Sequence, residues 1–245
     1  MPTLLALDVS PRGDRSISRA LAKRFVEHWQ ARNPGGTVIY RDLNASRIPY
    51  MDSDWIAGVY APPDVERTPQ MKKALALSGE LIAELQAADL LFISTPMYNF
   101  TIPAVLKSWI DYVVRPGYTF RLASGWPGML ANKRARLIVV SRASYHAGEP
   151  SEVDDLVTPV LRKALSFMGI DDVGVLRAGG SLAVNLGKVR SGFVQVTLCL
   201  PTSGSESSNG DNRAMPHWEQ QGVRSLPRCA FMRTYVVSQR TVDSC

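Results

Sequence analysis

The chain has few of the residues that metal centres and disulfide frameworks need. It contains three cysteines and three histidines in 245 residues. All three cysteines, Cys199, Cys229 and Cys245, lie in the last quarter, and none has the closely spaced cysteine or histidine partner of a zinc site. The histidines are far apart, without HxH or HExxH spacing. We therefore expect an intracellular chain with free thiols and no metal site.

Long apolar runs are also absent. No stretch approaches the roughly 18 apolar residues that a membrane-spanning helix needs, so we expect no contact with a membrane. The first ten residues, MPTLLALDVS, have no basic leader, and their short apolar piece runs directly into a turn. This pattern is typical of a strand rather than of a signal peptide, and it favours a cytoplasmic location.

The charge balance is positive but dispersed. The formal net charge is +6, yet the Lys and Arg residues are scattered and no aromatic residues interleave with a basic stripe. Nucleic-acid binding is therefore not expected. A local site for a small anion such as a phosphate needs only a few of these cations.

Short apolar runs alternate with segments of helical period up to about residue 182, which is the pattern of a parallel sheet wrapped by helices. Strands are predicted near residues 3–7, 37–40, 90–95, 135–140 and 173–177. We expect an α/β fold of the flavodoxin-like, doubly wound kind, with five parallel strands in the order 2-1-3-4-5. An irregular stretch at 45–67 is a candidate lid. One domain of this fold is expected over 1–189.

The tail from residue 190 has a different composition. It is polar and rich in Ser and Gly around TSGSESSNGDN, and it shows no helical period. We expect an atypical, irregular extension over 190–245. The closing helix of the fold is either shortened to about 183–189 or replaced by something else.

The segment SPRGDRSIS joins the first strand to the first helix, where free backbone N–H groups and the helix dipole favour an anion. Ser10, Ser16 and Ser18 add hydroxyl groups, and Arg12 and Arg15 add charge. The loop has neither GxGxxG nor GxxxxGK[ST], which disfavours a dinucleotide or a triphosphate and favours a phosphate monoester. The alternative is that Ser16 merely caps the helix.

Two further loops follow the third and fourth strands. Met97, Tyr98, Asn99 and Phe100 are of types that suit a flat heteroaromatic ring, although ordinary turn and core residues remain the alternative. Residues 141–145, SRASY, follow the fourth strand. The carboxyl ends of parallel strands share one edge, so the three loops are expected to converge on one site.

The motifs SPRGDRSIS, PMYNFTIPAVLKSWIDYV, GYTFR and SFMGIDDV resemble the FMN-dependent NADH-azoreductase and NAD(P)H quinone oxidoreductase family over about residues 1–182. The resemblance implies a homodimer with one FMN per subunit at the subunit interface. The residues it places on the FMN phosphate are Ser10, Ser16, Ile17 and Ser18, and those on the ring are Met97, Tyr98, Asn99, Phe100, Ser141, Arg142, Ala143 and Ser144. It also places Phe120 and Tyr145 on the substrate side.

This family usually has Gly-Gly where the chain has Ala143 and Ser144, and these side chains would crowd the approach to the flavin. The implied activity is ping-pong, two-electron transfer from NADH or NADPH to quinones or azo compounds. It demands no catalytic acid or base, because the flavin carries the chemistry and Asn99 only helps to position it.

Three alternatives stay open. The first is a flavodoxin-like electron carrier that binds FMN. The second is a specialised biosynthetic flavin reductase of the same fold, and the third is a degraded homologue whose tail reflects a shifted reading frame. The positive charge, the 45–67 loop and the aromatic residues near 118 favour an enzyme over a carrier.

Overall fold

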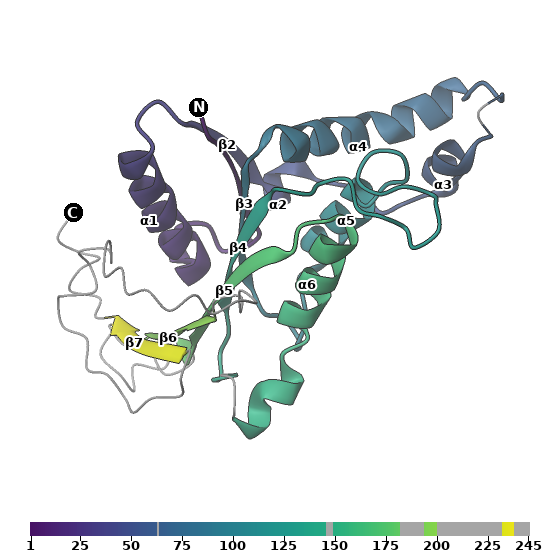
Figure 1. Cartoon of the computed structure of the whole chain (residues 1–245). Coiled ribbons are helices and arrows are strands. Elements are labelled where there is room, and N and C mark those ends of the chain that lie inside the picture. The colour runs from purple at the N-terminus through teal and green to yellow at the C-terminus, as the bar shows by residue number, and fades with distance from the viewer. Residues whose placement is uncertain (63, 146–148, 182–193, 200–231, 238–245) are drawn as a thin grey trace.

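The structure, a computed structural model, describes residues 1–62, 64–145, 149–181, 194–199 and 232–237 (Figure 1). Five parallel strands form the centre of the sheet in the order β2-β1-β3-β4-β5, which confirms the order expected from the sequence. These strands are β1 (Thr3–Asp8), β2 (Thr37–Asp42), β3 (Leu90–Pro96), β4 (Arg134–Val140) and β5 (Asp172–Gly179).

Two antiparallel strands, β6 (Val194–Cys199) and β7 (Met232–Val237), extend the sheet beyond β5. The sequence pattern did not predict them, because the composition of the extension in which they lie is polar and rich in Ser and Gly. Both are rich in β-branched residues, as strands commonly are. The expected closing helix at 183–189 lies outside the described residues, as does the rest of the extension, and the division at residue 189 stays a prediction.

Six helices and two short 3-10 turns connect the strands in the described part of the chain. They are η1 (Gly13–Arg15), α1 (Ile17–Arg32), α2 (Leu43–Ser46), α3 (Ser53–Tyr60), α4 (Pro69–Ala87), α5 (Ala104–Val113), η2 (Pro150–Asp154) and α6 (Val157–Phe167). Helix α1 lies on one face of the sheet, and α4, α5 and α6 lie on the other (Figure 1).

Helix α3 lies within the 45–67 stretch that was expected to be irregular. Asp52 caps it, because the Asp52 carboxylate accepts a hydrogen bond from the N–H of Trp55 at 2.7 Å. The buried Trp55 side chain anchors α3 to the core. The cap and the apolar anchor thus stabilise α3, a helix that is too short to show a clear hydrophobic period in the sequence.

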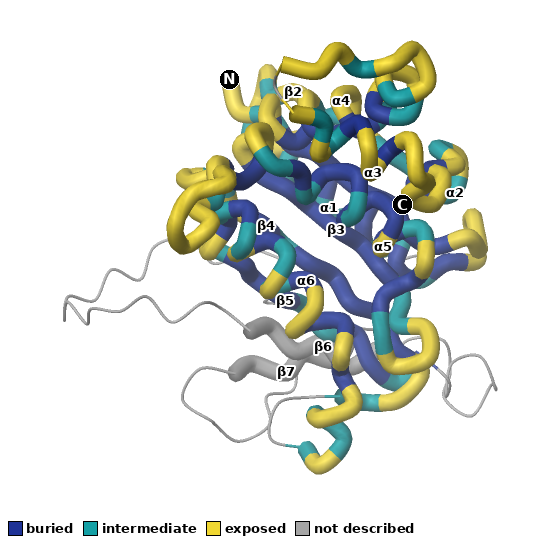
Figure 2. Tube along the Cα trace, turned by 90° about the vertical axis from the view of Figure 1, so that its right-hand side faces the viewer, coloured by how far each residue is buried: buried dark blue, intermediate teal, exposed yellow. Residues whose placement is uncertain are grey.

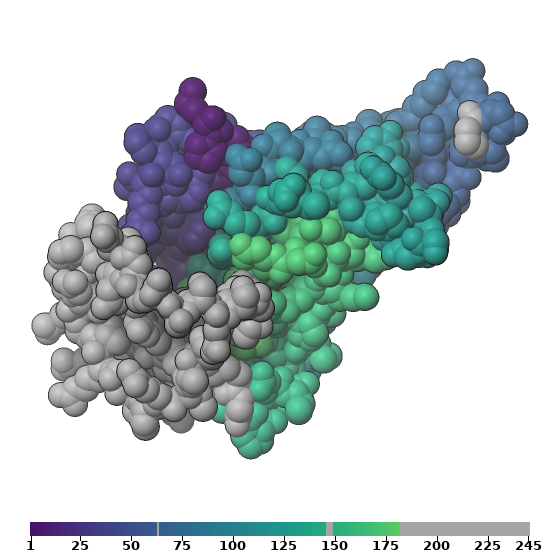
Figure 3. Space-filling view, in the orientation of Figure 1, coloured from purple at the N-terminus to yellow at the C-terminus, as the bar shows by residue number. Residues whose placement is uncertain are grey.

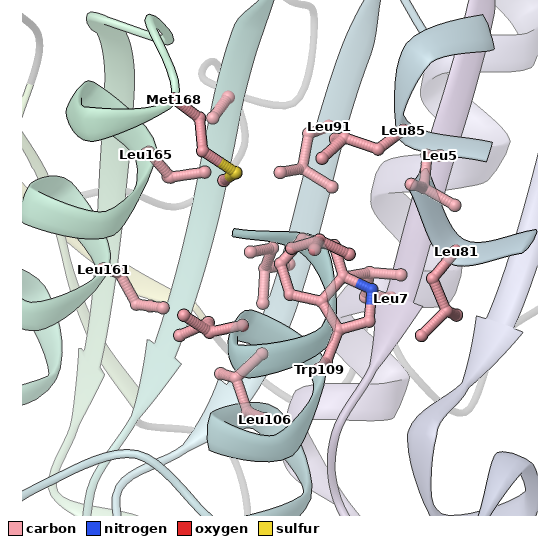
Figure 4. Packing of buried hydrophobic residues seen from close by; sticks show 14 of the residues in the cluster. Leu5, Leu7, Leu81, Leu85, Leu91, Leu106, Trp109, Leu161, Leu165 and Met168 are labelled. Carbon is pink, nitrogen blue, oxygen red and sulfur yellow. The ribbon is translucent and has the colours of Figure 1, made fainter. Parts of the chain in front are cut away.

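The central strands are buried along most of their length (Figure 2), and the core is built on both faces of the sheet. Leu5 and Leu7 of β1 face the larger cluster, which includes Trp109 of α5 (Figure 4). The alternate residues of β1 face α1, where Phe25 and Phe92 stack with ring centroids 4.0 Å apart. Packing on both faces makes the sheet a rigid support for the loops at its edges.

Candidate functional site

The three loops predicted to converge do meet at the carboxyl edge of the sheet. The N–H of Val9, at the start of the first loop, donates to the carbonyl of Ser94 in β3 at 3.2 Å. The N–H of Met97, in the second loop, donates to the carbonyl of Val140 at 2.8 Å, directly before the third loop begins at Ser141. The N–H of Ser141 donates to the carbonyl of Ala178 in β5 at 3.0 Å, so each loop is tied to the neighbouring strand where it leaves the sheet.

The first loop ends on the N-terminus of α1. Ser16 caps this helix, because its hydroxyl accepts from the N–H of Arg19 at 3.3 Å, and the same hydroxyl lies 3.0 Å from that of Ser18. Ser10, Ser16 and Ser18 are all buried, and Ile17 is half-buried. The first-turn N–H groups of a helix have no carbonyl partner within it, so hydroxyls and amides gather at one helix start, which suits an anion. Ser16 does cap the helix, as the alternative interpretation held, and it also lies inside this polar cluster.

The second loop is a tight turn from Tyr98 to Thr101, with reciprocal backbone hydrogen bonds of 3.0 and 3.1 Å. Its two central residues, Asn99 and Phe100, have positive φ values of 47° and 71°. Positive φ at both central positions is the geometry of a type I′ turn, which normally uses Asn and Gly. A Phe in this conformation costs about 1–2 kcal/mol, and such strain is common at functional sites.

The strained turn presents aromatic side chains to solvent. Tyr98 is 39% exposed and Phe100 52% exposed, whereas the half-buried Met97 packs against the core. The carbonyl of Phe100 accepts from the N–H of Leu156 at 3.0 Å, which fastens the turn to the start of α6. The turn therefore holds an exposed aromatic surface in a fixed position at the sheet edge.

The third loop folds back on itself. The buried Ser141 donates its hydroxyl hydrogen to the carbonyl of Ala143 at 2.7 Å, and Ser144 pairs with Glu149 at 2.7 Å. Neither Ala143 nor Ser144 has a positive φ, so the loop does not require Gly-Gly for its own conformation. A side chain at Gly179 of β5 would meet the carbonyl of Ala143 at 3.0 Å. The close approach of this loop to the sheet thus depends on Gly179.

The remaining predicted residues are distributed over two places. Arg142 is exposed on the third loop, and Tyr145 is half-buried at its end. Phe120 lies on the excursion between α5 and β4, where it is buried between Trp126 and Phe167 with ring centroids 5.8 and 4.8 Å away. Phe167 ends α6 and precedes β5, so within one chain Phe120 lies toward the opposite edge of the sheet from the three loops.

A groove of about 740 Å³ opens between α3, α5 and α6. Helix α3 and the beginning of α4 project from the body of the molecule (Figure 3). The groove lining is mainly apolar and includes Tyr60, Val160 and Phe167, and both Tyr60 and Val160 are solvent-exposed. Contiguous exposed apolar surface of this kind is typical of an interaction site. Phe167 belongs both to this groove and to the cluster around Phe120.

Arg19 is the residue at the site that the sequence did not reveal. Its guanidinium reaches back from α1 and donates two hydrogen bonds to the carbonyl of Ser10. An arginine three residues after the capping Ser16 was the available signal, but the sequence does not show where such a side chain turns.

Two absences hold for the described residues. They contain no group of three or more His, Cys, Asp or Glu side chains arranged to hold a metal ion. Within the same ranges, no helix is both long and apolar enough to cross a membrane.

Comparison with known proteins adds to this geometry. A family described as having a flavodoxin-like fold matches residues 2–188. The chain is 41% identical over 196 residues to FMN-dependent NADH:quinone oxidoreductase 8 of Burkholderia lata, covering 80% of this chain and 92% of that protein. It is 44% identical over 180 residues to the FMN-dependent NADH:quinone oxidoreductase of a Nostoc species, covering 73% and 86%.

Solved structures show the same fold. An azoreductase of Bacillus anthracis superposes with a TM-score of 0.70 at 25% identity, over 76% of this chain and 90% of that one. A further structure from that organism, an FMN-dependent NADH-azoreductase in complex with FMN, has a TM-score of 0.69 at 23% identity over 77% and 91%.

Proposed function

The chain belongs to the flavodoxin-like family that includes the FMN-dependent NADH:quinone oxidoreductases, and we propose that it uses FMN to reduce quinones and azo compounds with NADH. The observation that carries the proposal is the convergence of three loops at one sheet edge. One loop provides an anion site at a helix start, and the next provides an exposed aromatic turn under backbone strain.

The residues at this edge fit FMN. The buried hydroxyls of Ser10, Ser16 and Ser18, with the first-turn N–H groups of α1, suit a phosphate monoester. Residues 97–100 would lie against the ring, with residues 141–144 on the neighbouring loop. In this assignment Ile17 supplies its backbone at the helix start, and Arg142 lies at the exposed rim of the third loop.

When it is bound, the flavin supplies the redox chemistry, taking two electrons from NADH and passing them to the acceptor. The chain's own residues bind the flavin and orient its ring. The type I′ turn holds Tyr98 and Phe100 in place before any ligand arrives, so little ordering remains to be done on binding. Asn99, at the tip of that turn, helps to position the ring, and Tyr145 lines the side where donor and acceptor alternate.

We also propose that the protein is a homodimer. The apolar groove between α3, α5 and α6 is a surface that a second copy would cover. Phe167 connects the groove to Phe120, so a partner seated there would bring the Phe120 and Trp126 cluster toward the partner's sheet edge. This arrangement gives Phe120 a place in the substrate pocket that it does not have within one chain.

Sedimentation velocity tests the homodimer. Val160→Glu places a charge in the groove and is expected to yield monomers with lower quinone reductase activity. Ala31→Glu makes the same charge change on α1, across the sheet, and is expected to leave the dimer intact. A wild-type protein that sediments as a monomer at micromolar concentration would contradict the proposal.

A flavodoxin-like electron carrier is the alternative function, and turnover separates the two. We expect steady-state oxidation of NADH by the FMN-loaded protein when menadione is the acceptor. A carrier, which depends on a separate reductase, shows FMN binding without direct turnover. We also propose the expected cytoplasmic location, since an enzyme that consumes NADH needs a compartment that supplies it.

A further inference from the structure

The guanidinium of Arg19 is clamped onto the first loop. Its Nε and Nη2 donate to the carbonyl of Ser10 at 2.9 and 2.7 Å, and Nη2 also donates to Oδ2 of Asp42 at 2.7 Å. The side chain is only 22% exposed. A cation that donates two hydrogen bonds to one carbonyl fixes the direction in which that carbonyl points.

Asp42 holds Arg19 from the end of β2, where it also caps α2. Its Oδ1 accepts from the N–H groups of Asn44 and Ala45, which leaves Oδ2 directed at Arg19. Burial acts to raise the pKa of Asp42, but the hydrogen bonds from Arg19 and Asn44 outweigh it and hold this pKa below its ordinary value. Asp42 is therefore charged at neutral pH and is itself fixed by the backbone.

The neighbouring carbonyl is engaged in the same way. Asn44 donates its side-chain N–H to the carbonyl of Val9 at 2.9 Å. Two consecutive carbonyls at the start of the loop, those of Val9 and Ser10, are thus bound by side chains from α2 and from α1. The loop is oriented by residues that are not among the predicted ligands.

The direction of the Ser10 carbonyl matters because the next residue is Pro11. A proline has no N–H, so the Ser10–Pro11 peptide offers an anion only its carbonyl oxygen, which repels a phosphate. The favourable arrangement turns this carbonyl away from the anion. The Ser10 hydroxyl, which accepts from the N–H of Arg12 at 3.3 Å, and the helix-start N–H groups can then donate to the anion. Arg19 is the group that binds the carbonyl in that direction.

Arg19 is not a free cation for the phosphate. It lies between two carboxylates, because its Nη1 is 3.6 Å from the buried Asp8 while its Nη2 contacts Asp42. Asp8 accepts a further hydrogen bond, at 2.6 Å, from the hydroxyl of Tyr40. The two carboxylates thus balance the positive charge of Arg19, and the role left to Arg19 is to fix the geometry of the first loop.

We infer that Arg19, held by Asp42, is a positioning residue that sets the preference of the site for phosphorylated over unphosphorylated flavin. The inference rests on the proposed use of FMN. It concerns the phosphate end alone, because the hydrogen bonds and ion pairs of Arg19 join it to Ser10, Asp42 and Asp8 and, among the described residues, to neither of the two loops assigned to the ring.

The test measures the dissociation constants of FMN and of riboflavin for the apoprotein. Loss of hydrogen bonds from a charged group predicts about a tenfold or larger weakening of FMN binding in Arg19→Gln, with riboflavin changed by less than about threefold. Arg32→Gln removes the same charge from the exposed end of α1 and is expected to leave both constants unchanged.

Asp42→Asn distinguishes positioning from charge. Asn still caps α2, but it holds the Arg19 guanidinium less firmly. Positioning predicts a lower ratio of FMN to riboflavin affinity in this variant, whereas a role for charge predicts a higher ratio, since an anion has been removed near the phosphate. An unchanged or higher ratio overturns the inference even if Arg19→Gln does not fold.

Failure of the inference is distinct from failure of the proposed function. If the wild type binds neither FMN nor riboflavin, the proposed function fails. If the wild type binds FMN and Asp42→Asn keeps or raises its ratio of affinities, only the positioning role is lost.

Discussion

The strained turn at Phe100 predicts an unusual order of stability between two substitutions. Both Phe100→Ala and Phe100→Gly remove the aromatic ring, and they differ only in whether a Cβ remains at a residue with φ of 71°. We expect the glycine variant to be the more stable of the two, because glycine adopts this conformation without steric cost.

The magnitude follows from two opposing effects. A left-handed conformation costs a residue with a Cβ about 1–2 kcal/mol, and glycine avoids that cost. Glycine loses about 0.5–1 kcal/mol to alanine through the larger entropy of the unfolded chain. The glycine variant should therefore be more stable by about 1 kcal/mol, and both variants should bind FMN more weakly because the exposed ring is missing.

Urea denaturation of the apoproteins measures the difference. The control is Gly79→Ala, which lies in α4 with open space at the added Cβ, and which should stabilise the protein by about 0.5–1 kcal/mol. If alanine is as stable as glycine at residue 100 while Gly79→Ala behaves as expected, the turn does not have the strained geometry, and the argument for a preformed ring surface fails.

Three further predictions concern other parts of the fold, and urea denaturation measures each. Gly128→Ala should destabilise by about 3 kcal/mol, because the new Cβ would lie 2.2 Å from the backbone N of Gly169; a loss below about 1 kcal/mol would show that the 115–130 excursion moves freely. Asp155→Ala should lower the free energy of unfolding by about 3 kcal/mol, because it leaves the mostly buried Arg177 without its carboxylate. Adding Arg177→Met should recover part of this loss; strict additivity of the two single-variant effects would refute the coupling between the two residues. Asp42→Asn should destabilise at pH 7. The difference in unfolding free energy from wild type should narrow only as the pH falls below about 4, because a carboxyl with a lowered folded pKa stabilises above its unfolded pKa and loses this effect as the pH falls through the folded pKa; a difference independent of pH would contradict the charged state of Asp42.

The order of the central sheet and the three site loops followed from the sequence because their signals are local. Buried parallel strands appear as continuous apolar runs, as at β3, and a capping serine such as Ser16 marks the start of a helix. Parallel topology then places the ends of β1, β3 and β4 at one edge without further information.

The features that the sequence did not reveal depend on contacts between distant segments. The bond from Arg19 to Asp42 joins α1 to β2 across 23 positions, and no local pattern records it. The positive φ of Phe100 runs against the residue preference of its turn, so the sequence argues for an ordinary conformation there. The burial of Phe120 under Trp126 and Phe167 likewise depends on how the 115–130 excursion packs against α6.

The most direct test of the account is an anaerobic titration of the FMN-loaded protein with NADH, followed by visible absorbance. We predict that the absorbance of oxidised flavin bleaches with about one equivalent of NADH per FMN and returns when menadione is added. A purified protein that stays colourless after incubation with FMN, or a bound flavin that NADH does not bleach, would contradict the assignment of this sheet edge as the active site of an FMN-dependent NADH:quinone oxidoreductase.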